Sequence, residues 1–246
     1  MSAEESFSFI KLLTYLIGVG VVWLIFKKTM RLLFPLMLNF MMNKVHSSLQ
    51  IKKKLFDEAF ENVSTNNKSS KLEILEIGIG TGCNFKHFPK DANVTILDKD
   101  DQFLSYLRAS MERENRQDLQ ISKLVVNTGE NMKDIKSNSM DAVVHTFIMC
   151  SVSDYSLVMQ EIHRVLKPGG VCIFIEHSID EKNFLRRLIQ LTIQSLGLFQ
   201  ECKFLPMRKV LESSKCETVI LKDYKLNGLA FNCMNPLVYG YSKKSL

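Results

Sequence analysis

Three glycines at alternate positions follow a short apolar segment, and this feature constrains the fold more than any other. Residues 72–77 have the length and composition of a strand that is buried on both faces. Gly78, Gly80 and Gly82 come directly after it. Glycine lets a backbone turn tightly and pass close beneath a ligand, where a side chain would collide. Open α/β sheets bind ligands beyond the carboxyl ends of their strands. The glycines therefore indicate a ligand site, and the alternative interpretation is a turn with a purely structural role.

A second apolar segment ends in an acid, which favours the ligand site. Residues 94–97 lead into Asp98, which lies 22 positions after Glu76. In sheets of this kind, a carboxylate at the tip of the second strand accepts hydrogen bonds from ribose hydroxyls. The alternative role for Asp98 is to cap a helix that begins near Asp101. The spacing Gly-x-Gly-x-Gly differs from the Gly-x-Gly-x-x-Gly of diphosphate sites, so we expect a nucleoside ligand without a diphosphate.

Strand and helix patterns then alternate along the chain. This alternation predicts a parallel sheet with helices on both faces. A third strand that runs into a polar turn is predicted at residues 124–132, and further strands at residues 140–150 and 171–176. Helices are predicted at residues 83–88, 101–115, 154–166, 181–198 and 202–214. Two strands, at residues 217–226 and 237–241, end the chain.

These segments, in this order, resemble the class I S-adenosylmethionine-dependent methyltransferases over residues 72–177. The resemblance implies a Rossmann-like α/β fold with a seven-stranded, mostly parallel sheet and an antiparallel last strand. Several short motifs are similar to the membrane-anchored thiol S-methyltransferases, also called methyltransferase-like seven. They are Gly80-Thr81-Gly82 with Asn84-Phe85, Gly129-Glu130 with Met132, Cys150-Ser151-Val152, Pro168-Gly169-Gly170, Glu176-His177 and Tyr239-Gly240-Tyr241.

The resemblance implies S-adenosyl-L-methionine as the cofactor and assigns residues to it. Glu76 would support the glycine loop and the methionine end of the donor, and Asp98 would hold the ribose. Glu130 and Asn131 would border the adenine, with Met132 against its face, although a plain turn residue is the alternative for Glu130. The full cofactor set is Glu76, Gly78, Gly80, Thr81, Gly82, Asn84, Phe85, Asp98, Lys99, Gly129, Glu130, Asn131, Met132 and Thr146. Lys99 departs from the family, where a proline commonly follows the acid.

The candidate catalytic residues lie on the acceptor side, where the predicted fourth and fifth strands end. They are His145, Cys150, Ser151 and His177. His145 stands where relatives tend to have cysteine; a neutral imidazole there could accept a thiol proton. A hydrogen-bonded structural histidine is the competing role for both histidines. A thiol with a pKa near ~8.5 is already a few per cent thiolate at neutral pH, so a base helps but is not required.

The N-terminal part of the chain predicts a membrane anchor. Residues 7–26 are apolar apart from Lys11, and residues 32–42 form a second apolar segment, interrupted by Pro35, which suits the membrane interface. A packed core helix is the alternative. We divide the chain into an anchor at residues 1–44, a linker helix and turn at residues 45–70, and a methyltransferase domain at residues 71–246.

The charge distribution supports a membrane surface as the partner of this leader. Residues 1–56 carry eight basic and two acidic side chains, which accounts for the whole formal charge of +6. In the remaining residues the basic and acidic side chains are equal in number, so we expect no nucleic-acid partner. The six cysteines form no close pair, so we expect no metal and reduced thiols facing the cytosol. The family implies the endoplasmic reticulum and lipid droplets.

The sequence therefore predicts a membrane-associated methyltransferase that acts on the sulfur of small or alkyl thiols, with hydrogen sulfide as a further candidate acceptor. The thiol comes from the resemblance. A membrane quinone or lipid is the alternative acceptor, and a non-catalytic membrane or lipid-droplet protein that retains the fold is the alternative from another class. The acceptor, the use of a base, the depth of the anchor and the oligomeric state are left open.

Overall fold

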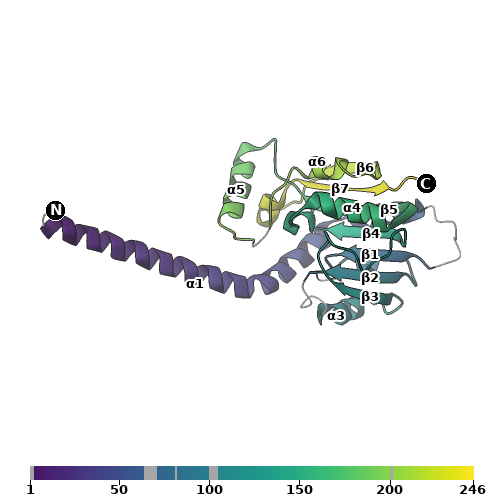
Figure 1. Ribbon diagram of the computed structural model, residues 1–246, viewed down its shortest axis with the longest axis horizontal. Helices are drawn as coiled ribbons and strands as arrows, with labels where there is room; N and C mark the ends of the chain where they lie inside the picture. Colours follow the sequence, from purple (N-terminus) through teal and green to yellow (C-terminus); the bar gives the residue numbers. More distant parts are fainter. Residues whose placement is uncertain (1–2, 64–70, 81, 100–104, 200–201) are drawn as a thin grey trace.

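A seven-stranded sheet carries helices on both faces, and a long N-terminal helix extends away from it (Figure 1). The computed structural model describes residues 3–63, 71–80, 82–99, 105–199 and 202–246. The strands are β1 (Glu73–Ile77), β2 (Asn93–Asp98), β3 (Gln120–Val126), β4 (Met140–Thr146), β5 (Leu166–His177), β6 (Glu217–Tyr224) and β7 (Leu237–Lys243). The helices are α1 (Ala3–Ser48), α2 (Ile51–Glu61), α3 (Ser105–Arg113), α4 (Tyr155–Val165), α5 (Phe184–Ser195) and α6 (Met207–Glu212), with short 3₁₀ turns η1 (Phe85–His87), η3 (Met149–Ser151) and η4 (Leu229–Met234).

The strand order is β3-β2-β1-β4-β5-β7-β6. Strands β1 to β5 pair in parallel, and β7 lies antiparallel between β5 and β6. This arrangement confirms the predicted Rossmann-like methyltransferase fold with its antiparallel last strand. Because the parallel strands all point the same way, the ends of β1, β2, β4 and β5 meet at one edge of the sheet.

The two faces of the sheet are covered by two separate apolar clusters. Alternate residues of each strand point to opposite faces, so Ile74 of β1 joins one cluster and Leu75 joins the other. The first cluster packs against the end of α1 and against α2, through residues such as Phe56. The second packs against α4 and α6, through residues such as Ile162. The N-terminal segment is therefore part of the core that supports the edge of the sheet at which β1, β2, β4 and β5 end.

Helix α1 runs without interruption for 46 residues. The expected break at Pro35 is wrong: proline removes one backbone hydrogen bond, and the chain stays helical on both sides of it. Many apolar side chains between Ile10 and Phe26 are exposed, for example Val22 at 68%. Among the residues described, no helix has both the length and the hydropathy to cross a bilayer.

Three further local predictions differ from the structure or lie outside it. Residues 83–88, predicted as a helix, contain only the short turn η1, because Pro89 ends it at once. Strand β5 begins at Leu166, so it includes Pro168; the pairing with β4 shifts register there, between Met140 and Ala142, which tolerates a proline. The polar turn expected at residues 64–70 lies outside the described residues.

Candidate functional site

The glycine loop after β1 adopts a backbone that favours glycine. Gly78, Gly80 and Gly82 have φ angles of +71°, +49° and +66°. A Cβ on Gly78 would lie 2.8 Å from Cδ1 of Ile148, and one on Gly82 would overlap the Ser110 side chain. A Cβ on Gly80 would meet no described atom within 4 Å. The positive φ angles favour glycine at all three positions, and packing against Ser110 adds to this at Gly82. Among the described residues, the space beside Gly80 is left for a ligand.

Glu76 is a buried carboxylate directly beneath this loop. Its side chain belongs to β1 and is 1% exposed, and its Oε1 accepts a hydrogen bond of 2.8 Å from Nδ2 of Asn84. Its Oε2 has no hydrogen-bond partner among the described residues. Burial raises the pKa of Glu76 to about 8, although Asn84 and Lys52 act to lower it. A buried carboxylate with one unsatisfied oxygen is suited to receive a cationic group from a ligand.

A buried lysine from the N-terminal segment, which was not predicted from the sequence, completes this polar cluster. Lys52 on α2 is 1% exposed and donates to Oδ1 of Asn84 and to the Cys83 carbonyl at 3.2 Å. Its Nζ lies 2.7 Å from Nδ1 of His46. Burial lowers the pKa of Lys52 to about 7, and it lowers the pKa of His46 well below its usual value. Asn84 also donates to Oγ1 of Thr146 at 3.1 Å. Asn84 therefore links α2, the loop, β1 and β4.

The spacing of apolar residues in α2 and just before it contained the signal for Lys52. Leu49, Lys52, Phe56 and Ala59 follow one another at helical intervals of three and four, and all four are buried. A lysine within such a stripe either reaches past it to solvent or needs a partner in the interior. Here it finds three partners beneath the donor loop.

Asp98 ends β2 beside the loop, as the sequence predicted. It is 8% exposed, and the end of β2 is tied to the loop by the hydrogen bond of 2.8 Å from Gly78 N to the Leu97 carbonyl. Glu76, the open position at Gly80 and Asp98 therefore lie along adjacent strand ends, in the order that an elongated aminoacyl nucleoside requires. This set fits S-adenosylmethionine. Thr81, also expected here, lies outside the described residues.

The other predicted cofactor residues divide into a group that follows β3 and a group of packing side chains. Gly129, Glu130 and Asn131 follow β3 at the same edge of the sheet, where an adenine would lie. Oε1 of Glu130 accepts hydrogen bonds of 2.6 Å from Ser153 N and 3.3 Å from Asp154 N, so this carboxylate also fixes the start of α4. Backbone hydrogen bonds of this kind hold its pKa low, even though burial acts to raise it.

Two side chains in the cofactor set are packing residues. The Met132 side chain is 0% exposed within the cluster beneath α4, and its packing on the adenine face stays a prediction. Phe85 is also 0% exposed and packs against Phe88. Lys99 is exposed to solvent beside Asp98.

His145 lies inside the protein, at the end of β4. It is 0% exposed, and its Nδ1 lies 2.8 Å from Oε1 of Glu176, which also accepts from Ile148 N at 3.1 Å. Its ring packs against Phe174, with ring centroids 5.9 Å apart. These contacts describe an internal pair that shapes the turn after β4. A residue enclosed in this way does not contact an acceptor in this arrangement, so proton transfer through His145 has no support here.

A second group, of sulfur and imidazole, lies at the ends of β4 and β5. Cys150 in η3, His177 at the end of β5 and Cys202 after α5 place one ligand atom each within 4.8 Å of one another. A hydrogen bond with Cys202, together with burial, holds the pKa of the Cys150 thiol well above its usual range. Burial alone would lower the pKa of His177, but the facing Cys150 raises it. Ser151 is half-buried, with Oγ 3.5 Å from Sγ of Cys150. Sequence spacing gave no sign of Cys202.

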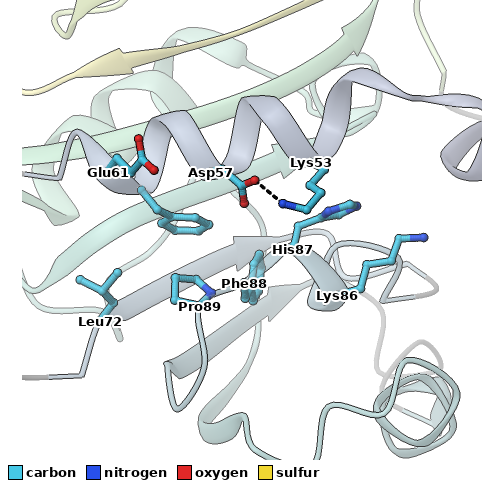
Figure 2. Close-up of a pocket in the computed structure, with 9 residues that line it drawn as sticks. Lys53, Asp57, Glu61, Leu72, Lys86, His87, Phe88 and Pro89 are labelled. Atoms are coloured by element: carbon cyan, nitrogen blue, oxygen red, sulfur yellow. Dashed lines mark hydrogen bonds and ion pairs between the residues drawn. The ribbon is translucent and has the colours of Figure 1, made fainter.

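A surface pocket of about 750 Å³ lies elsewhere, between α2 and the turn η1 (Figure 2). Lys53 and Asp57 form an ion pair on its α2 side, and Leu72, just before β1, lies at its other end. Leu72 marks the amino end of β1, whereas the glycine loop follows the carboxyl end. None of its lining residues belongs to the glycine loop or is Glu76 or Asp98, and we assign no chemistry to it.

Comparison with known proteins agrees with this geometry. Residues 75–174 match the model of a methyltransferase domain. The chain is 35% identical to human thiol S-methyltransferase TMT1A over 179 residues, which cover 72% of each chain. It is 40% identical to human thiol S-methyltransferase TMT1B over 145 residues, which cover 58% of this chain and 57% of that protein. A SAM-dependent methyltransferase from Methanosarcina mazei has the same fold, with a TM-score of 0.54 at 19% identity over 74% of this chain and 96% of its own.

Proposed function

The chain belongs to the thiol S-methyltransferase family and is an S-adenosylmethionine-dependent methyltransferase, and from this premise we propose that it methylates the sulfur of small or alkyl thiols at a membrane surface. The observation that carries the thiol acceptor is the similarity to TMT1A over 72% of both chains. The acceptor is expected to lie between the glycine loop and the ends of β4 and β5.

The donor supplies a methyl group on a sulfonium, which is already activated toward a nucleophile. The protein's task is to hold the nucleophile in line with that methyl group, at about 3–3.5 Å, away from water. Gly80 leaves room for the donor, Glu76 offers its free oxygen to the amino group, and Asp98 accepts from the ribose hydroxyls. Ile148 touches the loop at Gly78, so the turn after β4 forms the wall that faces the methyl group.

The proposed chemistry does not require a strong base. A free thiol has a pKa near ~8.5, so a few per cent is thiolate at neutral pH. His145 and Glu176 then serve as a buried pair that holds the turn after β4 in place, through the hydrogen bond from Ile148 N to Glu176. Accordingly, the rate is expected to follow the ionisation of the acceptor thiol.

Two exposed apolar surfaces support action at a membrane. The first is α1, where side chains such as Leu12 and Leu16 are each 56% exposed. The second is α5, where Phe184 is 80% and Leu185 65% exposed. Figure 1 shows α5 on the side of the sheet from which α1 extends. Exposed apolar patches of this kind mark protein or membrane contacts, and the basic residues near α1 favour an anionic lipid surface.

The proposal is tested by identifying the methylated product. The full chain is incubated with methyl-labelled S-adenosylmethionine and, in parallel, with alkyl thiols, with hydrogen sulfide and with quinone-containing vesicles. We expect labelled methyl sulfides from the thiols, and a rate that rises with pH up to the pKa of each thiol. Label found in a quinone or lipid, with none in the thiols, would replace the thiol by the alternative acceptor.

A further inference from the structure

Three potential metal ligands from distant parts of the chain meet at the acceptor side of the site. Cys150, His177 and Cys202 bring their ligand atoms within 4.8 Å of one another. Sγ of Cys202 lies 3.2 Å from Nε2 of His177. Cys150 is 4% and His177 3% exposed, and Cys202 is partly exposed. Of these three side chains, Cys202 is therefore the one that reaches solvent.

The surrounding contacts hold these side chains in place. Lys203 N donates to the Cys150 carbonyl at 2.8 Å, and Lys203 Nζ donates to the Val152 carbonyl at 3.1 Å. The segment that carries Cys202 is therefore fastened to the turn that carries Cys150. The His177 ring packs against Phe147 and Phe204, with centroids 6.5 Å and 5.0 Å away. Side chains fixed in this way are preorganised for a common ligand.

The chemistry of the three groups suits zinc. Two thiolates and an imidazole are a donor set that Zn²⁺ prefers, and three protein ligands leave the fourth tetrahedral position open, as in catalytic zinc sites. A Cys150–Cys202 disulfide would use only two of the three groups and would leave His177 unexplained. Spacing alone argued against a metal, because the three residues lie far apart in sequence; folding brings them together.

The cluster lies next to the place where the methyl group would be presented. Strand β4 lies between β1, which leads into the glycine loop, and β5, which ends at His177. Ile148, two residues before Cys150, is the residue that a Cβ on Gly78 would touch. The cluster therefore lies beside the turn that packs against the donor loop.

We propose that Cys150, His177 and Cys202 bind one zinc ion, whose open position takes the sulfur of the acceptor; the second clause rests on the thiol acceptor proposed above. The acceptor thiol gives its proton to water as its sulfur is bound. A sulfur lone pair then forms the bond to the methyl carbon. The bond from that carbon to the sulfonium breaks, and its electron pair stays on the sulfur of S-adenosylhomocysteine. No oxidant or reductant takes part.

The metal site is tested on the full chain, purified under reducing conditions. We expect about one zinc per chain by elemental analysis, and cobalt substitution should give the intense absorption of cobalt–thiolate bonds in tetrahedral geometry. Cys150→Ser, Cys202→Ser and His177→Ala should each reduce the metal to background, whereas the matched control Cys233→Ser should keep it. Calorimetric binding of S-adenosylmethionine shows whether each variant is folded.

Two results would overturn the site. They are reduced wild-type protein that binds neither zinc nor cobalt, and metal content that persists in all three variants. If protein without metal still methylates thiols, the proposed function stands and the zinc site is refuted. A cobalt spectrum that shifts on addition of an alkyl thiol supports the open position, and a spectrum that stays unchanged refutes it.

Discussion

At the scale of single residues, polar groups buried beneath the donor loop set the character of the site. Glu76 and Lys52 are both enclosed, and burial pushes each toward its neutral form, with pKa values of about 8 and about 7. Asn84 lies between them and bonds to both. The loop is therefore supported by a network whose charge changes near neutral pH, and a cationic donor would favour the charged form of Glu76.

The shifted pKa of Lys52 predicts a pH-dependent stability. Its pKa is about 7 in the folded protein and near its ordinary value of 10.5 in the unfolded chain. Between these values the unfolded state binds more protons, so the Lys52 contribution to stability rises with pH. The free energy of unfolding of the wild type, minus that of Lys52→Met, should increase by up to about 1.4 kcal/mol per pH unit over this range.

Denaturant unfolding from about pH 7 to about pH 9.5 measures this effect. The exposed neighbour Lys53 provides the matched control, and Lys53→Met should show a constant difference from wild type. If the free energies of unfolding of wild type and Lys52→Met change with pH in parallel, the burial of Lys52 does not shift its pKa.

At the scale of elements, the sequence predicted the strands and main helices because their apolar patterns are local. The glycine loop and Asp98 could be predicted for the same reason, since each depends on a short motif, whereas the antiparallel last strand came from the family resemblance. The cluster of Cys150, His177 and Cys202 could not, because it forms only when the ends of β4 and β5 meet the segment after α5. Lys52 was missed because a lysine in a basic segment resembles a solvated one.

Strand pairing at Gly240 gives a prediction at this scale. Gly240 in β7 packs against β6, and a Cβ there would overlap the Ile220 carbonyl, where the register of the pair is irregular. Gly240→Ala must push the two strands apart, so the free energy of unfolding should fall by at least about 2 kcal/mol. Urea denaturation monitored by circular dichroism measures the change. Gly197→Ala is a second glycine variant, at a helix end with a φ of +63° and no described atom near its Cβ. It should cost only the strain of that φ, about 1 kcal/mol, and equal losses would remove the packing explanation.

At the scale of the whole molecule, one long helix joins the outside of the protein to the donor site. The end of α1 carries the buried His46, whose Nδ1 meets Lys52 beneath the loop, while its first half presents exposed apolar side chains. Whatever binds the outer part of α1 is therefore connected to the donor site through one continuous element.

Lipid vesicles test the outer part of α1. The full chain should cosediment with vesicles of phosphatidylcholine and phosphatidylserine. The triple variant Leu12→Gln, Leu16→Gln, Val19→Gln should bind at least about tenfold more weakly, because it removes apolar area available for burial in the lipid. Val219→Gln changes an exposed apolar residue on β6 and should bind as wild type does. Equal binding by the triple variant would show that α1 is not the lipid contact.

Donor binding to the full chain, measured by titration calorimetry, tests the central claim most directly. Wild-type protein should bind S-adenosylmethionine, and Asp98→Ala should weaken binding at least about tenfold, since it removes charge-assisted hydrogen bonds to the ribose. Glu112→Ala, which removes an exposed carboxylate from α3, should bind as tightly as wild type. Wild-type protein that does not bind the donor, or Asp98→Ala protein that binds it unchanged, would contradict the site described here.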